Sequence, residues 1–256
     1  MKKATFLNHK KALIVAMVQA YTPSRIKELM DACFVEGAEG FGMQFCRMKN
    51  QYKSKEIYKE LFAYANGLPI YVTNYRQGEN EGVSDEELAK GLVELAKCGA
   101  TLCDVMGDMF DRQDDEMAKD EEAIEKQMEL IKELHNAGAE VLMSSHIMKF
   151  TSAERVLEIA LEQQRRGADI CKIVVGANNM AEQIENLRII NLLKENLNIP
   201  FLFLCGGESH IIRRIGGEIG CCMYLAVHEH DELATPAQPL LRDLTSIVNG
   251  LRSFNN

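Results

Sequence analysis

Short apolar runs alternate with longer polar-apolar stretches along almost the whole chain. The runs are nearly continuous rather than alternating, which is typical of parallel strands buried on both faces. They lie at Ala12–Val18, Phe41–Cys46, Pro69–Asn74, Leu102–Val105, Val141–Ser145, Ile170–Val175, Pro200–Leu204 and Cys221–Val227. The pattern therefore predicts eight strands that belong to one parallel sheet.

Stretches with helical spacing of apolar residues follow these runs. They lie at Pro23–Glu36, Ser54–Ala65, Ser84–Cys98, Lys119–Ala137, Ser152–Arg166, Met180–Leu197, Ser209–Ile215 and Leu240–Leu251. Ser84 with Glu87 three residues later forms a capping box, and Gly99 follows the predicted end of that helix. Eight strand–helix units in 256 residues predict an α/β protein, a single-domain (β/α)8 TIM barrel over residues 1–256.

Composition narrows the range of partners. Hydrophobic residues make up 46% of the chain and charged residues 26%, as in globular proteins. A net charge of −9 argues against a nucleic acid or an anionic membrane as partner. The apolar run near the N-terminus is too short for a membrane span or a signal core. Eight cysteines without a CxxC pair indicate reduced thiols, a cytoplasmic protein and no zinc ribbon.

One segment interrupts the regular rhythm. Residues at about 107–125 carry nine acidic side chains against two basic ones, which predicts an acidic insertion after the fourth strand. A solvated acidic face is the expected role of such a charge run, and a lid or a partner surface is the alternative. His228 and His230 have the spacing of metal ligands, but no third ligand is evident, so we expect no metal site.

Ionisable residues gather near the ends of five consecutive predicted strands. They are Arg47, Arg76, Asp104, His146 and Lys172. In a (β/α)8 barrel the active site is built at the carboxyl ends of the strands. We therefore expect these five side chains to converge at one end of the barrel.

Lys172 and His146 suggest the chemistry. An ammonium group in a strand buried on both faces is costly unless it is paired or neutral, and a neutral amine attacks carbonyl groups to form an imine. The alternative is a structural lysine that pairs with a carboxylate such as Asp104. His146 ends the neighbouring strand and can move protons near neutral pH, which makes it a candidate general acid and base or, alternatively, a satisfied rim histidine.

The segments around these two residues resemble the type I 3-dehydroquinate dehydratases, which are Schiff-base-forming barrel enzymes of the shikimate route to aromatic amino acids. LMSSH at Leu142–His146 is similar to the family's strand with the general-base histidine, and GADICKIVV at Gly167–Val175 to the strand with the imine-forming lysine. The resemblance runs from about residue 12 to 251. It implies a lyase that converts 3-dehydroquinate, a small anionic hydroxyketo-acid, to 3-dehydroshikimate and water, without a metal or organic cofactor.

The same resemblance implies a set of substrate contacts. Arg47 and Arg76 fall on family arginines that hold substrate oxygens, and Asp104 falls on a strand acid that would tune the catalytic pair. SHIIRRIGGEIG at Ser209–Gly220 is similar to the segment with the carboxylate-binding arginine. Alignment on its Gly-Glu pair places that role on Arg214 rather than on the preceding arginine.

A loop at about 228–239 is similar to the family's lid after the eighth strand. The resemblance makes Gln238 a substrate contact. Ala234 replaces the serine that the family has before the proline, and Thr235 is its expected substitute.

The chain departs from the family pattern where hydroxyl groups of the substrate are recognised. Phe45 falls on the glutamate of the Glu-x-Arg strand, while the adjacent Gln44 is expected to point to the opposite face. Asn80 falls on the acid that orients the histidine, with Glu81 one place late, and Met106 falls on a second strand acid.

These departures leave alternatives to the dehydratase. A class I aldolase, or a dehydratase of a related hydroxyketo-acid, would keep the imine and change the substrate. A catalytically silent barrel would bind an acidic metabolite or a partner protein. A homodimer is compatible with the sequence in each case.

Overall fold

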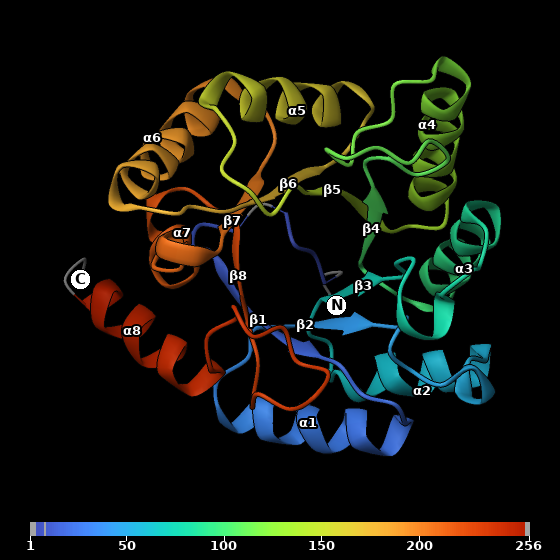
Figure 1. Cartoon of the computed structure of the whole chain (residues 1–256). Coiled ribbons are helices and arrows are strands. Elements are labelled where there is room, and N and C mark those ends of the chain that lie inside the picture. Colours follow the sequence, from blue (N-terminus) through green and yellow to red (C-terminus); the bar gives the residue numbers. More distant parts are fainter. Residues whose placement is uncertain (1–3, 8, 254–256) are drawn as a thin grey trace.

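Eight parallel strands surround a common axis in the computed structural model, which describes residues 4–7 and 9–253 (Figure 1). The strands are β1 (Leu13–Val18), β2 (Gly40–Gln44), β3 (Ile70–Thr73), β4 (Leu102–Met106), β5 (Glu140–His146), β6 (Ile170–Val175), β7 (Phe201–Cys205) and β8 (Met223–Ala226). Each predicted strand is present, with ends that shift by at most two residues. The predicted domain range of 1–256 also includes residues 1–3, 8 and 254–256, which lie outside the described part.

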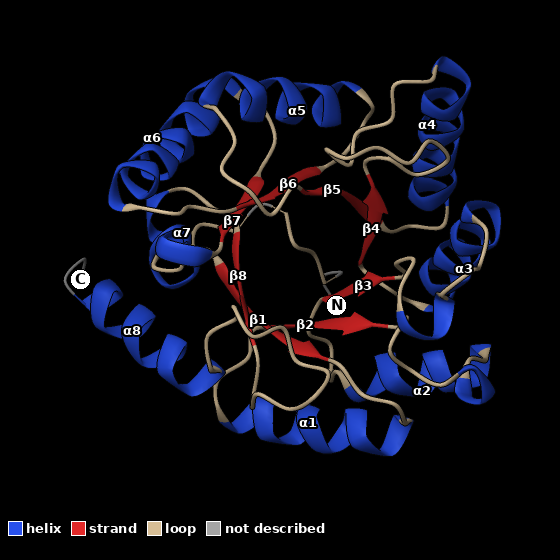
Figure 2. Ribbon diagram, in the orientation of Figure 1, coloured by secondary structure: helices blue, strands red, loops and turns tan. Residues whose placement is uncertain are grey.

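The helices form a ring around the strands (Figure 2). They are α1 (Pro23–Val35), α2 (Lys55–Tyr64), α3 (Asp85–Cys98), α4 (Glu121–Asn136), α5 (Ala153–Arg165), α6 (Met180–Asn196), α7 (Ile212–Ile219) and α8 (Leu241–Ser253). Short 3-10 turns at Asn50–Tyr52, Gly78–Asn80 and Gly207–Ser209 were not predicted, and the last of them delays the start of α7. Among the described residues, none of the helices has the length and apolar character needed to cross a bilayer.

Side-chain caps explain where most helices begin. The helix start leaves backbone N–H groups without partners, and a Ser, Thr, Asp or Asn oxygen can accept from one of them. Six residues do so here: Thr22, Ser54, Ser84, Asp120, Ser152 and Asn179. At the end of α3, Gly99 has a φ of 120°, a conformation that side chains disfavour.

The strands pair in the order β7-β6-β5-β4-β3-β2-β1-β8, and every pair is parallel. Between β7 and β8 the backbone N–H of Cys222 donates to the carbonyl of Phe201 at 2.9 Å, which bridges the remaining seam. This arrangement confirms the predicted (β/α)8 barrel.

The pleat of β2 defines which side chains enter the barrel. A Cβ atom on Gly42 would lie 2.2 Å from Sδ of Met17 and 3.1 Å from the ring of Tyr71, so glycine leaves room for side chains that cross the interior. Since successive strand residues point to opposite faces, Gly42 and Gln44 face inward, and Met43 and Phe45 face the helices.

The loop between β4 and α4 is held against the barrel by a buried arginine. Arg166, at the end of α5, donates to the carbonyls of Gly107 and Ala118 at 3.2 and 2.8 Å and to Oε1 of Gln127 at 2.7 Å. Its Nε donates to Glu162 at 2.7 Å. The loop is therefore an ordered part of the barrel wall.

Several acids of this loop make specific contacts rather than forming a solvated face. Asp111 accepts from the backbone of Lys119 and Asp120, and Asp115 pairs with Arg155. Asp108 accepts from Arg76, and Glu116 accepts from His146 at the carboxyl end of β5. The expected solvated face is wrong for these four acids, and it holds for the exposed Asp114, Glu121, Glu122 and Glu125.

Candidate active site

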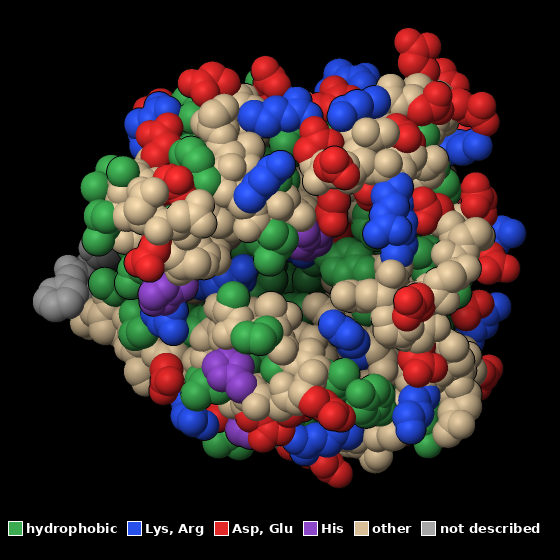
Figure 3. Space-filling model, viewed as in Figure 1, with side chains coloured by type: hydrophobic (Ala, Val, Ile, Leu, Met, Phe, Trp, Pro, Cys, Tyr) green, Lys and Arg blue, Asp and Glu red, His purple; other side chains and the backbone are tan. Residues whose placement is uncertain are grey.

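The carboxyl ends of the strands surround a hollow on the barrel axis (Figure 3). Histidine and basic side chains lie beside this opening in the space-filling view, among tan and hydrophobic surfaces. Lys172, Asp104 and His146 lie on β6, β4 and β5, and all three face inward by the pleat of their strands.

Lys172 is held by a buried polar cluster. Its Nζ lies 3.1 Å from Oδ2 of Asp104, 3.0 Å from the hydroxyl of Tyr71 and 2.9 Å from the hydroxyl of Tyr75. The side chains of Lys172 and Asp104 are 5% and 0% exposed, so they form an ion pair shielded from water. The predicted pairing of Lys172 with Asp104 is present, which both readings of this lysine allow.

Asp104 is the acceptor at the centre of the cluster. Tyr71 and Tyr75 both donate to its Oδ2, and Ser144 donates to its Oδ1. Burial by itself would raise the pKa of Asp104, but the Lys172 ammonium and the nearby His146 outweigh burial and lower that pKa. Asp104 is therefore a carboxylate that three hydroxyl groups and one ammonium hold in place.

Sequence reasoning missed the two tyrosines. Tyr71, Thr73 and Tyr75 lie two residues apart, so they share the inner face of β3 and its extension. Because aromatic residues are common in strand cores, Tyr71 resembled a core residue in the sequence. The two-residue spacing from Tyr71 to Tyr75 was the available signal.

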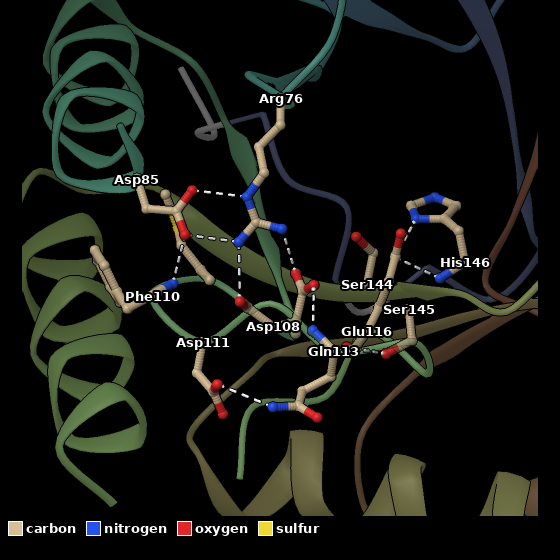
Figure 4. A network of polar contacts seen from close by, with 12 residues as sticks. Arg76, Asp85, Asp108, Phe110, Asp111, Gln113, Glu116, Ser144, Ser145 and His146 are labelled. Atoms are coloured by element: carbon tan, nitrogen blue, oxygen red, sulfur yellow. Dashed lines mark hydrogen bonds and ion pairs between the residues drawn. The ribbon is translucent and has the colours of Figure 1, made fainter. Parts of the chain in front are cut away.

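His146 is oriented by an acid from the β4–α4 loop (Figure 4). Oε2 of Glu116 accepts from the backbone N–H of His146 at 2.6 Å and lies 2.9 Å from its Nδ1. Glu116 has a φ of 48°, a left-handed conformation that is uncommon for a residue other than glycine. With Nδ1 engaged, Nε2 is the ring nitrogen through which His146 can act on a ligand.

The acid expected at Asn80 or Glu81 is thus replaced in space by Glu116. Asn80 is instead buried, donates to Oδ1 of Asn74 and to the carbonyl of Tyr75, and accepts from Lys53. Sequence reasoning assigned no individual role to Glu116, because it lies in a run of acids whose members look alike.

Arg76 is used inside the protein. Its Nε and Nη2 donate to the two carboxylate oxygens of Asp85 at 2.7 and 2.6 Å, and its Nη1 donates to Asp108 at 2.8 Å. Nη2 also donates to the carbonyl of Asp108 at 2.9 Å (Figure 4). Four of the five N–H donors of a guanidinium are therefore occupied. Arg76 therefore ties the acidic loop to α3, and its expected contact with substrate oxygens stays a prediction.

Arg213, not Arg214, lies at the carboxyl end of β7. Its Nε donates to the carbonyl of Cys205 at 2.7 Å, its surface is 5% exposed, and burial lowers its pKa. In the described part of the chain no carboxylate lies within ion-pair distance of Arg213. Arg214 is partly exposed and contacts the carbonyl of His210 at 3.3 Å. Of the two arginines, Arg213 is therefore the buried cation without a carboxylate counterion in the described residues.

The side chains of Phe45 and Gln44 point in directions opposite to those expected from the sequence. Phe45 is 2% exposed and packs edge-on against Tyr58 and Phe62 of α2, with ring centroids 4.9 and 5.8 Å apart. Gln44 faces the barrel interior. The expectation that Phe45 lines the site is wrong, because the pleat of β2 turns it toward the helix layer.

Buried polar atoms without partners cluster at the β1–β3 side of the mouth. Within the described residues, side-chain atoms of Gln19, Gln44, Arg47, Thr73 and Gln238 are buried and make no hydrogen bond. Gln44 and Thr73 are register partners on neighbouring strands. Such groups cost free energy unless a ligand or water satisfies them, so this side of the mouth suits a polar ligand.

The lid residues take up defined places. The backbone N–H of Gln238 donates to the carbonyl of Thr235 at 3.0 Å, and the Gln238 carbonyl contacts His230 at 2.8 Å. His228 lies 3.0 Å from Glu36. No group of three or more potential metal ligands occurs in residues 4–7 and 9–253.

The fold and this cluster define a (β/α)8-barrel protein with a buried lysine–carboxylate pair and a histidine at the carboxyl end of its strands. Within that class, the chain belongs to the type I 3-dehydroquinase family, whose model matches residues 45–254. This family is one of dehydratases, which are carbon–oxygen lyases of the shikimate pathway.

Individual relatives support the assignment. The chain is 33% identical over 142 residues to a 3-dehydroquinate dehydratase of Alkaliphilus oremlandii, a match that spans 54% of each chain. It is 26% identical over 210 residues to that of Clostridium novyi, which covers 80% of this chain and 78% of the relative.

Solved structures share the fold. A 3-dehydroquinate dehydratase from Geobacillus kaustophilus superposes with a TM-score of 0.82 at 16% identity, covering 96% of this chain and 93% of the other. A type I 3-dehydroquinate dehydratase from Clostridium difficile, with covalently modified comenic acid, gives 0.78 at 19% identity, with 96% and 94% covered.

The placement of Phe45 generates a test of the register of β2. Phe45→Ala should lower the free energy of unfolding by about 3–5 kcal/mol, since it removes a buried ring from the barrel–helix interface. Gln44→Ala is the matched control and should change it by less than about 1 kcal/mol, because its amide oxygen has no partner to lose. Urea unfolding followed by circular dichroism measures both, and a larger loss for Gln44→Ala would contradict the register.

Proposed function

We propose that the protein dehydrates 3-dehydroquinate to 3-dehydroshikimate through an imine on Lys172. The observation that carries this proposal is the buried Lys172–Asp104 pair at the barrel mouth, with His146 beside it, in a chain of this family. The substrate is a small anionic hydroxyketo-acid, and the reaction needs no electron transfer.

Lys172 is the nucleophile of the proposed mechanism. Its amine adds to the ketone carbon, and loss of water from the adduct leaves a protonated imine. This cation withdraws electrons from the adjacent carbon and makes its C–H bond acidic. Asp104 stabilises the cation at both stages, because its carboxylate lies 3.1 Å from Nζ.

His146 moves the protons of the elimination. Nε2 removes the proton next to the imine and then protonates the departing hydroxyl group, which leaves as water. Hydrolysis of the imine releases the product and restores the lysine. Glu116 holds the imidazole by Nδ1 and the backbone of His146 by its N–H, so it acts as a positioning residue.

Arg213 supplies the site for the substrate carboxylate. A buried guanidinium that lacks a carboxylate partner gains a charge-assisted pair when an anion binds. Arg47 and Gln238 carry unpartnered buried atoms at the same mouth. We propose that Nε of Arg47 donates to a substrate oxygen and that Oε1 of Gln238 accepts from a substrate hydroxyl group. Thr235 stays a predicted contact of the lid.

One observation favours a related substrate as the second candidate. The inward position on β2 is the neutral Gln44, and the neighbouring inward position on β3 is Thr73. An amide and a hydroxyl read substrate hydroxyl groups without a negative charge. A dehydratase or class I aldolase that acts on another hydroxyketo-acid would use the same Lys172 imine.

The central test combines turnover with trapping of the imine. The protein should convert 3-dehydroquinate to a product with the enone absorbance of 3-dehydroshikimate, and borohydride added during turnover should leave one adduct on Lys172, seen by mass spectrometry. Lys172→Met should abolish both signals, because it removes the amine that forms the imine from the cluster of Tyr71, Tyr75 and Asp104. Lys53→Met is a control at a different lysine. An adduct on any other lysine contradicts the mechanism.

Replacing the acid beside His146 tests its positioning role. Glu116→Gln should lower kcat by about 10–100-fold with little change in KM. The reason is that an amide at this position no longer accepts from both the backbone N–H and Nδ1 of His146 as the carboxylate oxygen does, so the imidazole is held less firmly. Asp114→Asn, at an exposed acid of the same loop, should leave both unchanged. An unchanged kcat in Glu116→Gln would show that Glu116 only shapes the loop.

The neighbouring arginines separate carboxylate binding from surface charge. Arg213→Met should raise KM for 3-dehydroquinate by about 10–100-fold, the equivalent of losing a hydrogen-bonded charge pair of about 1.5–3 kcal/mol. Arg214→Met removes the same charge from the partly exposed position and should change KM less than threefold. Steady-state kinetics distinguish the two, and the reverse pattern would restore the assignment from sequence.

A further inference from the structure

The hydroxyl groups of Tyr71 and Tyr75 flank the amine of Lys172, and of these two only Tyr75 lies on the side of the barrel mouth. We propose that Tyr75 is a catalytic residue that relays protons from the Lys172 amine to the ketone oxygen while the imine forms. This inference rests on the proposed function, since it concerns the first step of that reaction.

Tyr75 contacts both proposed catalytic side chains, Lys172 through its hydroxyl and His146 through its ring. The hydroxyl lies 2.9 Å from Nζ of Lys172, and the Tyr75 ring packs edge-on against the His146 ring with centroids 5.4 Å apart. Tyr75 is half-buried beyond the end of β3, whereas Tyr71 is fully buried inside the barrel. A ligand that enters from the mouth therefore meets Tyr75 before it meets Tyr71.

The step needs a proton carrier at this place. A lysine ammonium reacts with a ketone to give a protonated imine and one water molecule. The imine nitrogen keeps one of the three ammonium protons, so the other two must reach the ketone oxygen. The first leaves Nζ before the nitrogen–carbon bond forms and the C=O electron pair moves onto oxygen. The second follows as the carbon–oxygen bond breaks and water departs. No external acid, base or oxidant is consumed.

Tyr75 is arranged to carry both protons. Its oxygen accepts from Nζ while its own proton is donated, at present to Asp104, and a ketone oxygen in the mouth would take that place as acceptor. Burial and the Asp104 carboxylate raise the pKa of Tyr75 well above its ordinary value, which keeps the phenol protonated and able to donate. In the described residues, Nζ of Lys172 makes hydrogen bonds with Tyr71, Tyr75 and Asp104. His146 is not among these partners, and its Nδ1 is bound to Glu116.

The second tyrosine offers a matched control. Tyr71→Phe and Tyr75→Phe each remove one oxygen, one hydrogen bond to Asp104 and one to Lys172, and each keeps its ring. The two variants differ in whether the lost hydroxyl faces the mouth. A role that only supports the Lys172–Asp104 pair predicts equal effects, and a proton relay predicts unequal ones.

The experiment measures imine formation in a single turnover. Enzyme in excess is mixed with 3-dehydroquinate and quenched with borohydride at increasing times, and the Lys172 adduct is counted by mass spectrometry. Tyr75→Phe should slow adduct formation by about 10²–10⁴-fold, the range for a positioned acid–base group, while Tyr71→Phe should slow it less than tenfold. Unfolding midpoints of both variants check that the barrel is intact.

The outcomes separate this inference from the proposed function. Wild-type turnover and trapping with an unslowed Tyr75→Phe, or with equal losses in the two variants, would overturn the proton relay and leave the dehydratase assignment standing. Failure of the wild type to form any adduct or 3-dehydroshikimate would overturn both. A selective loss of adduct formation in Tyr75→Phe supports the relay.

Discussion

The buried ion pair between Lys172 and Asp104 is the constraint on which the rest of the mouth depends. Taking two charges out of water is costly, and either charge left alone in the barrel interior would be more costly still. The protein meets this constraint by surrounding the pair with hydroxyl groups from Tyr71, Tyr75 and Ser144. The amine of Lys172 is thereby shielded from water, oriented by its hydrogen bonds and placed next to hydroxyl groups that can exchange protons.

The mouth is divided into two sides of different character. On the β4–β6 side, charged and hydroxyl groups satisfy one another, and the acidic loop contributes Glu116 to His146. On the β1–β3 side and under the lid, buried amide, hydroxyl and guanidinium atoms have no protein partner in the described chain. In the mechanism that we propose, the first side reacts with the carbonyl group and the second recognises the polar groups of the ligand.

The assignments of Phe45 and Arg214 each differ by one residue from a position that the structure singles out. Gln44, not Phe45, faces the barrel interior, and Arg213, not Arg214, is the buried arginine at the carboxyl end of β7. A one-residue shift reverses the direction of a side chain in a strand and turns it by about 100° in a helix.

The sequence by itself determined the barrel, its eight units, and the placement of Lys172, His146 and Asp104 on three neighbouring strands, because apolar runs and helical spacing are local and repeat eight times. Only the tertiary structure decided which partners those residues have. Glu116 reaches His146, Tyr71 and Tyr75 reach Lys172, and Asp85 and Asp108 occupy Arg76. Those contacts join residues from different strands and loops, and they depend on pleat direction and loop path, which a linear pattern does not encode.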